Sequence, residues 1–235
     1  MDRHITRSRA MVMQPLNTGA VSSALPRPTT LPCAVCDAFD EVAQTSVFRA
    51  GQELCAQGEP SYRVFRVKTG AVAAYRLFSD GRRQVMSFHL PGDFIGLEAG
   101  VSHGSTAVAL IETTVEAMRR SELSDLALND ADLGRALWQV SIRAFHRSEE
   151  HALVLARHGA LERIVSFLLN FADRAGAADA FDLPMSRQDM ADYLGLTIHT
   201  VSRTLSQLEA QGLVEARGSR QVRLLRRARL EDMLP

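Results

Sequence analysis

Residues 186–212 read SRQDMADYLGLTIHTVSRTLSQLEAQG, and this stretch decides the fold. Its apolar residues recur at helical spacing and predict two short amphipathic helices with apolar inner faces: Ala191, Leu194, Val201, Leu205 and Leu208. Between the helices, Gly195 suits a sharp turn, and Thr197 is a suitable N-cap for the second helix. Two helices joined by a glycine-containing turn form a helix-turn-helix, whose second helix lies in the major groove of DNA.

The start of the second helix carries side chains that suit DNA. We expect its exposed face to present short or forked hydrogen-bond donors for base edges and phosphates: His199, Thr200, Ser202 and Arg203. A helix that is merely solvated usually carries Glu and Lys instead. The alternative is a small helical hairpin with no role in DNA binding, and we favour the DNA-binding interpretation.

A hairpin follows the two helices directly. From Leu213 to Leu224, apolar and polar residues alternate on both sides of a Gly-Ser turn, which predicts two paired strands. Behind a helix-turn-helix, such a hairpin predicts a winged fold. The tip of this wing, which would contact DNA phosphates, carries Arg217, Ser219 and Arg220. We add Thr197 and Arg187 to the residues expected to contact DNA.

The segment from Phe48 to Met118 has the pattern of short strands. Three runs are β-type, residues 64–67, 72–75 and 85–88, and glycines punctuate them at regular intervals: Gly58, Gly70, Gly81 and Gly92. Short strands with turn glycines at this spacing predict a small antiparallel sandwich or barrel.

A long helix is expected from Ser121 to about Arg157, followed by a break at His158-Gly159 and another helix from Ala160 to about Arg174. The long helix has two apolar stripes, one made of Trp138, Ile142, Phe145, Ser148 with Glu149, Ala152 and Leu155, the other of Leu133, Leu137, Val140 and Ala144. One stripe is enough to cover the barrel, so two imply a second partner. The simplest partner is the same helix of another copy in a two-fold dimer. The alternative is a helix buried within its own subunit.

Composition limits the class of protein. The chain has 235 residues, 46% hydrophobic and 23% charged, with a formal net charge of zero, which is typical of a globular protein and not of a general polyanion binder. No apolar run approaches the roughly 20 residues that span a bilayer, and no secretory signal is recognised. Three cysteines make no disulfide framework, so a reducing cytoplasm is expected. Residues 1–30 are expected to form a flexible tail.

The order of strands, long helix and winged helix-turn-helix resembles that of Crp/Fnr-family transcription regulators. The resemblance covers roughly Phe48 to Leu225, and its most specific stretches are residues 90–93 (LPGD), 161–163 (LER), 191–197 (ADYLGLT) and 200–203 (TVSR). Residues 96–100 (GLEAG) and the recognition helix resemble the FixK-like branch, close to FNR. The implied fold is α+β: an N-terminal β-roll (a cyclic-nucleotide-binding-like jelly roll) over 31–123, a dimerisation helix over 124–157 and a winged helix-turn-helix over 158–235.

The resemblance also implies a function. These regulators bind a TTGAT-type palindrome as homodimers and contact RNA polymerase; by position, Arg203 addresses the guanine and Ser202 the neighbouring thymine. FNR-like helices usually carry Glu where this chain has His199. A glutamate accepts from a cytosine amine, whereas a histidine can donate to guanine or to a phosphate. We therefore expect the core half-site to differ at one base pair, or to be read less stringently there.

The expected roll lacks the residues with which this family binds a cyclic nucleotide. Those are a Glu for the ribose and an Arg for the cyclic phosphate, and aligned on residues 94–96 the positions hold Leu97 and Gly104. Only Ser105 and Thr106 keep a hydroxyl suited to phosphate. Burying a phosphate without its arginine is costly, so we expect no cyclic nucleotide.

The cysteines leave several alternatives open. An iron–sulfur cluster needs four thiolates, but Cys33 and Cys36 supply two, and Ala117 stands where the family has its ligand in the barrel. Cys55 fits a small core residue. A cluster, a labile redox pair and an intersubunit metal at Cys33/Cys36 remain alternatives. The resemblance to FixK-like proteins, which often work without a cofactor and are regulated through their own abundance, implies the same here, and we favour this interpretation.

Other classes have weaker support. Heme would need a histidine ligand, but no spacing singles out one among His89, His103, His146 and His151. An enzyme on a cupin-like barrel would need a metal cluster or a nucleophile with its base, and the nearby candidates lack metal-ligand spacing: His89, Glu98, His103 and Glu112. A scaffold whose winged helix binds protein is disfavoured by the donor-rich recognition helix. The sequence therefore predicts a dimeric DNA-binding regulator, not an enzyme, without a membrane partner.

Overall fold

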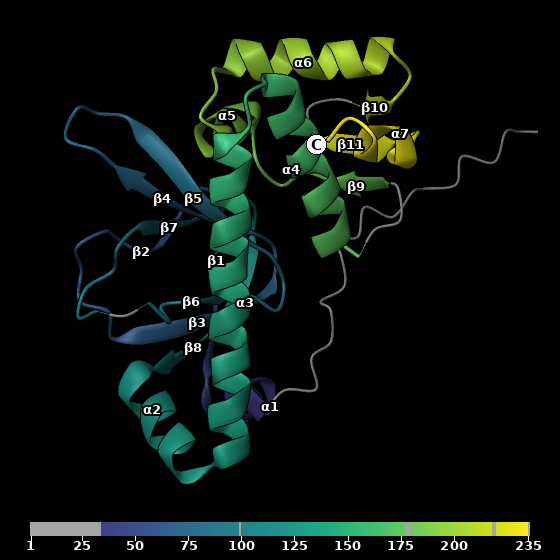
Figure 1. The fold of residues 1–235 in the computed structure, drawn as a ribbon. Helices are drawn as coiled ribbons and strands as arrows, with labels where there is room; N and C mark the ends of the chain where they lie inside the picture. Colours follow the sequence, from purple (N-terminus) through teal and green to yellow (C-terminus); the bar gives the residue numbers. More distant parts are fainter. Residues whose placement is uncertain (1–33, 99, 177–179, 218–219, 235) are drawn as a thin grey trace, which may run out of the picture.

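The computed structural model describes residues 34–98, 100–176, 180–217 and 220–234 (Figure 1). The expected tail, residues 1–30, lies outside this part of the chain. In Figure 1, helix α3 runs along the length of the molecule, with the sheets of the N-terminal half beside it. Helix α6 lies across the end of the molecule at which α3 finishes, far from α1 and α2.

The N-terminal half is a roll of two antiparallel four-stranded sheets, as the strand pattern predicts. One sheet has the order β1-β8-β3-β6 and the other β2-β7-β4-β5. The elements are α1 (Ala34–Val42), β1 (Gln44–Phe48), β2 (Glu53–Cys55), β3 (Arg63–Thr69), β4 (Val72–Leu77), β5 (Arg83–His89), β6 (Phe94–Ile95), β7 (Thr106–Ala109) and β8 (Thr113–Arg119). The three β-type runs of the sequence are therefore β3, β4 and β5, which confirms them.

Turn glycines join these strands as expected. Gly70, between β3 and β4, has a φ of 88°, a left-handed conformation that side chains with a Cβ rarely adopt. A Cβ at this position would also lie 2.5 Å from the backbone oxygen of Glu112, so the close approach of the next hairpin requires glycine. Gly81, in the tight turn of the β4–β5 hairpin, has a φ of 84°.

The expected long helix is two helices. Helix α2 spans Arg120–Asn129 and α3 spans Ala131–Ala156, and the chain leaves helical geometry at Asp130, whose φ is −129°. The Asp130 carboxylate accepts hydrogen bonds from the backbone N–H groups of Asp132 and Leu133, at 2.8 and 3.2 Å. An N-cap of this kind starts a new helix. The prediction of one continuous helix from residue 121 to about 157 was therefore wrong.

Replacing Asp130 with alanine is expected to lower the free energy of unfolding by about 0.5–2 kcal/mol, because two backbone donors lose their acceptor. Denaturant unfolding of the full chain measures this change. Asp125→Ala, which removes an exposed carboxylate of α2, is the control and should change stability by less than about 0.5 kcal/mol. Equal effects of the two substitutions would contradict the capping role.

Helix α1 was not predicted, and it accounts for the second apolar stripe of α3. Val35 and Phe39 of α1 are fully buried in one cluster with Leu133 and Val140 of α3. The stripe of Leu133, Leu137 and Val140 therefore packs within its own subunit, while Ala144 is exposed. The first stripe has a different environment, described below.

The C-terminal half is a winged helix-turn-helix packed on the roll. Its elements are α4 (Ala160–Arg174), β9 (Ala180–Asp182), α5 (Arg187–Leu194), α6 (Ile198–Ala210), β10 (Val214–Arg217), β11 (Gln221–Leu224) and α7 (Arg227–Glu231), with a sheet ordered β10-β11-β9. The predicted hairpin is β10–β11; the third strand, β9, and α7 were not predicted. One hydrophobic cluster joins this half to the roll, since Phe88 of β5 and Met190 of α5 belong to it. In the described part of the chain, no helix combines the length and the apolar character needed to span a membrane.

Candidate DNA-binding surface

Local sequence signals fix the two helices of the helix-turn-helix. Ser186 and Asp189 form a capping box at the start of α5, and Gly195 ends that helix in the left-handed conformation with a φ of 63°. Thr197 caps α6, because its Oγ1 accepts from the backbone N–H of Thr200 at 3.2 Å. The glycine turn and the Thr197 cap are therefore confirmed. The five apolar residues expected on the inner faces are all at most 1% exposed.

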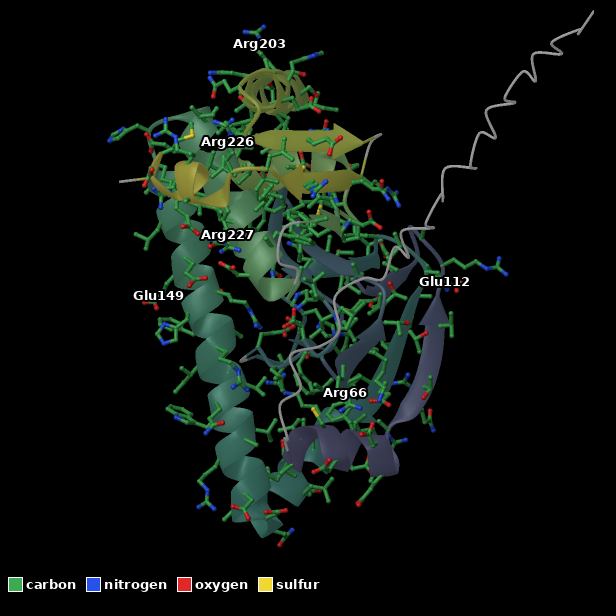
Figure 2. The ribbon with its side chains drawn as sticks, turned by 90° about the vertical axis from the view of Figure 1, so that its right-hand side faces the viewer. Arg66, Glu112, Glu149, Arg203, Arg226 and Arg227 are labelled. Carbon is green, nitrogen blue, oxygen red and sulfur yellow. The ribbon has the colours of Figure 1, made fainter. Side chains whose placement is uncertain are left out.

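The outer face of α6 presents most of the expected donors. His199, Ser202 and Arg203 are exposed, and Figure 2 shows Arg203 at the outer end of the molecule, pointing away from the protein. Thr200 is half-buried, and its hydroxyl lies 2.9 Å from that of Thr197. The first turn of α6 has no acidic residue, so the positive end of the helix dipole faces outward without a competing carboxylate.

The wing is held to the far end of α6. Glu209, near the end of α6, accepts a hydrogen bond from the backbone N–H of Ala216 in β10 at 2.9 Å. In the hairpin, Arg217 pairs in register with Gln221, and Arg220 is exposed. The Arg217 side chain and Ser219 lie outside the described residues, so their expected contacts with phosphates stay predictions.

Arg187 is placed differently from the other expected DNA contacts. It is half-buried, and its Nη1 is buried without a hydrogen-bond partner in the structure. Burial lowers the pKa of the guanidinium, while the charge of Glu209 opposes that shift. One nitrogen of the Arg187 guanidinium is therefore buried inside the protein, and the side chain is less accessible to a phosphate than the exposed donors of α6.

The first apolar stripe of α3 is exposed. Trp138 and Phe145 are 68% and 62% exposed, and Ile142 is 37% exposed; Leu153, which was not assigned to the stripe, is 67% exposed. Ser148 and Ala152 of the same face are exposed too. Glu149 interrupts the face, and Figure 2 shows it on the outer side of α3; its carboxylate lies 3.1 Å from Nδ1 of His146. No residue in the described part of the chain covers these apolar side chains.

Leu155 does not belong with that face. It is half-buried, and its Cδ2 lies 3.6 Å from where a Cβ on Gly195 would stand. The last turn of α3 has rotated this residue toward the helix-turn-helix, so Leu155 packs on the α5–α6 turn and not on the exposed stripe.

The interior of the roll is filled by small and aliphatic side chains and by the aromatic ring of Phe65. Its buried cluster contains Cys55, Phe65, Val67, Val72, Ile95, Ala107, Val115 and Ala117. At the two positions that would bind a cyclic nucleotide, Leu97 packs against the α1–α3 cluster, and the Gly104 carbonyl accepts from Arg76 Nε at 2.5 Å. The Thr106 hydroxyl accepts from the backbone N–H of Gln57. With Leu97 and Gly104 at these two positions, the described residues of the roll do not fit a buried cyclic phosphate, because neither position supplies a charged partner.

The two described cysteines lie in different environments. Cys55 is 8% exposed inside the roll, and burial raises the pKa of its thiol to about 11, as expected of a core residue. Cys36 lies on α1, within hydrogen-bonding reach of the Arg66 guanidinium. Cys33 lies outside the described residues.

Arg66 is the buried centre of an ionic cluster under α1, and Figure 2 shows it between α1 and the strands. It is 5% exposed, donates to Glu116 Oε2 at 2.7 Å and pairs with Asp40 of α1. Burial opposes its charge, but Cys36, Glu116 and Asp40 outweigh burial and raise the pKa of the guanidinium. The cluster therefore anchors α1, and with it Cys36, to the roll.

The histidines considered as heme or metal ligands are dispersed. His89 bonds Ser87, and burial lowers its pKa to about 4. His103 lies 2.9 Å from Glu98, and His151 bonds the backbone of Tyr193. Within the described ranges, no three His, Cys, Asp or Glu side chains gather as a metal ion would require.

Sequence reasoning missed the contacts that hold α5 to the roll. Arg83 Nη1 in β5 donates to Asp189 at 2.8 Å and to Asp192 at 3.0 Å, and Gln84 Nε2 donates to the Asp192 carbonyl at 2.6 Å. No motif marks these residues, because their partners lie about a hundred positions away in the sequence. Asp189 and Asp192, two acidic residues of α5 that face β5, were the only available signal.

Comparisons with known proteins agree with this architecture. A family model described as a Crp-like helix-turn-helix domain matches residues 162–233, and one described as a cyclic nucleotide-binding domain matches residues 45–130. The nitrogen fixation regulation protein FixK of Rhizobium meliloti is 40% identical over 188 residues, covering 80% of this chain and 86% of that protein. FixK of Azorhizobium caulinodans is 42% identical over 193 residues, 80% of this chain and 78% of that protein.

A solved structure extends the similarity to three dimensions. FixK2 from Bradyrhizobium japonicum superposes with a TM-score of 0.79 at 45% identity, covering 83% of this chain and 98% of that one. The domain order, the helix-turn-helix and the similar proteins all indicate the same family. The chain therefore belongs to the Crp/Fnr family, in its FixK-like branch, and is a DNA-binding transcription regulator, not an enzyme.

Proposed function

We propose that the protein works as a homodimer that binds a TTGAT-type palindrome. The observation that carries this proposal is the exposed apolar face of α3, with Trp138 and Phe145 more than 60% exposed on a helix of 26 residues. A monomeric protein seldom exposes a continuous row of large apolar side chains on one helix face, and the same helix of a second copy covers it by two-fold symmetry. Two α6 helices then address two half-sites.

In each half-site, Arg203 donates to guanine and Ser202 contacts the neighbouring thymine. The exposure of both side chains supports this assignment. His199, where FNR-like helices carry Glu, relaxes or shifts the preference at one base pair. On DNA the protein contacts RNA polymerase. It works in the cytoplasm, where DNA and RNA polymerase are both present.

We further propose that the protein binds its palindrome without a cofactor. Leu97 and Gly104 offer neither the acid nor the base that a cyclic nucleotide needs, and Ala117 is packed in the roll interior where the family has a cluster ligand. Control then acts through the amount of the protein.

Protein purified without oxygen is expected to be colourless, to bind its palindrome without addition and to be indifferent to cyclic AMP. The Cys33→Ser plus Cys36→Ser variant should bind equally well, because the proposal gives the thiols no role in DNA binding. Absorption spectra and fluorescence anisotropy with labelled DNA measure both results. A brown anaerobic preparation whose DNA binding is lost in air would show an iron–sulfur sensor instead.

A thiol switch at Cys36 is the second candidate. Cys36 lies within hydrogen-bonding reach of the Arg66 guanidinium, and a neighbouring cation is typical of the surroundings of redox-active cysteines. Loss of DNA binding on mild oxidation, reversed by a thiol and absent in the double serine variant, would favour this candidate. Unchanged binding after oxidation supports control by abundance.

A further inference from the structure

The end of α5 is capped by side chains from three other parts of the chain. The last four carbonyls of a helix have no partner within it. Of those of α5, that of Ala191 accepts from the backbone N–H of Gly195, and the other three accept from side chains. The donors are Gln84 of β5 to Asp192 at 2.6 Å, His151 of α3 to Tyr193 at 2.8 Å, and Arg163 of α4 to Leu194 at 3.0 Å.

His151 makes the most extensive of these contacts. It is 7% exposed, and its ring stacks on the Tyr193 ring at 3.8 Å between centroids with an interplanar angle of 3°. Burial lowers the pKa of the imidazole, so the ring is neutral near pH 7. Its single N–H lies on Nε2, because the Tyr193 carbonyl can only accept.

The contact also reaches the roll. The Tyr193 ring lies 5.0 Å from that of Phe88 in β5 and 5.6 Å from that of Phe167 in α4. The backbone of Met86, also in β5, is within hydrogen-bonding reach of the His151 ring. His151 is thus packed where the roll, α3 and the helix-turn-helix meet.

We propose that His151 is a positioning residue for the recognition helix: through Tyr193 it fixes α5, and hence α6, relative to α3. The inference rests on the proposed dimer, in which α3 carries the two-fold axis. Two recognition helices must lie one helical turn of DNA apart, about 34 Å, to fill both half-sites. A rigid joint between α3 and α5 holds that separation before DNA is bound, and a loose joint must be ordered on binding.

The proposal predicts a change in the tolerance for half-site spacing. The full-length wild type should bind a palindrome of its preferred spacing at least about tenfold more tightly than one with a base pair inserted or removed, because the separation of the helices is fixed. In His151→Ala, binding at the preferred spacing should fall about three- to tenfold, and the spacing penalty should shrink to about threefold or less. Base preference within each half-site and dimerisation should not change.

Three further variants isolate the role of His151. Tyr193→Phe keeps the stacked ring and the carbonyl, so its spacing penalty should match that of the wild type. His151→Gln keeps a donor at similar reach but loses the stack, so its spacing penalty should lie between those of His151→Ala and the wild type. If the alanine variant does not fold, the glutamine variant is compared with the wild type instead. His158→Ala, the same change at an exposed histidine, should have no effect.

An intact His151→Ala dimer with the full spacing penalty would overturn the proposal. So would a Tyr193→Phe variant that behaves like His151→Ala, because the hydroxyl and not the stack would then be responsible. A wild type that binds a single half-site as tightly as the palindrome would contradict the proposed dimeric function itself. A dimeric wild type that binds the palindrome at every spacing equally would overturn only the proposal of a rigid joint, so the two failures are distinct.

Discussion

Replacing Phe145 with glutamate is expected to convert the protein to a monomer and to abolish binding to the palindrome. Phe145 is 62% exposed in the middle of the apolar face of α3, between Ile142 and Ala152. In a two-fold dimer both copies of the new carboxylate enter the same seam, where each is desolvated without a cation to pair with, at a cost of several kcal/mol. The subunit itself should stay folded, because Phe145 makes no part of its buried clusters.

Sedimentation of the full chain measures the association, and anisotropy with labelled palindrome measures binding. Leu128→Glu is the matched control, because Leu128 is an apolar residue of α2 that is 84% exposed and lies off the α3 face. It should leave dimer and DNA binding unchanged. Ala152→Glu, on the same face, should also give a monomer. An intact dimer of the Phe145→Glu variant would show that this face is not the interface.

Replacing Arg203 with alanine is expected to weaken binding by about 1–3 kcal/mol per half-site and to relax the preference at the guanine. The guanidinium is exposed on the outer face of α6, and its fork matches the two acceptors of guanine in the major groove. Because a dimer contains two copies, the loss on the full palindrome should be about twice that on one half-site. Binding to palindromes with each base substituted in turn measures both effects.

Arg49→Ala is the control for charge, since it removes an exposed arginine from the roll without touching the winged domain. It should leave base preference and affinity nearly unchanged. If Arg203→Ala weakens binding equally for every base at that position, the arginine contacts a phosphate. The assignment of guanine to Arg203 would then be withdrawn.

The parts of the fold that the sequence predicts are those with local signals. Ser186, Asp189, Gly195 and Thr197 lie within one short stretch and specify where α5 and α6 begin and end. The roll strands are likewise separated by glycines whose positive φ values mark the turns. Such features need only neighbours in sequence, so they can be read without the structure.

The elements that were missed depend on distant partners. Helix α1 is short, and its exposed Asp40 is anchored to the buried pair of Arg66 and Glu116, which no local pattern reveals. The break at Asp130 had a local signal, an aspartate suited to an N-cap, but apolar periodicity continued on both sides and concealed it. Apolar spacing shows that a helix face is buried, but it does not show which neighbour buries it. The sequence therefore could not reveal that α1 covers one of the two stripes of α3.

The candidate site divides in the same way. The donors of α6 were found because a recognition helix has a recognisable face, and the structure places His199, Ser202 and Arg203 on it. Leu155 was assigned to the exposed stripe by periodicity alone, but it packs on the α5–α6 turn. Arg187 was expected to contact DNA, but one of its guanidinium nitrogens is buried. The residues that join α5 to the roll and to α3, namely Arg83, Gln84 and His151, have no motif of their own.

The central claim is that a two-fold dimer places two α6 helices on a palindrome without a cofactor. Selection of bound DNA from a random pool by the full-length protein, with and without oxygen, tests it most directly. The account predicts one motif under both conditions, with two TTGAT-type half-sites related by two-fold symmetry and relaxed or shifted preference at the base pair facing His199. A single unpaired half-site, or a motif recovered only in the absence of oxygen, would contradict it.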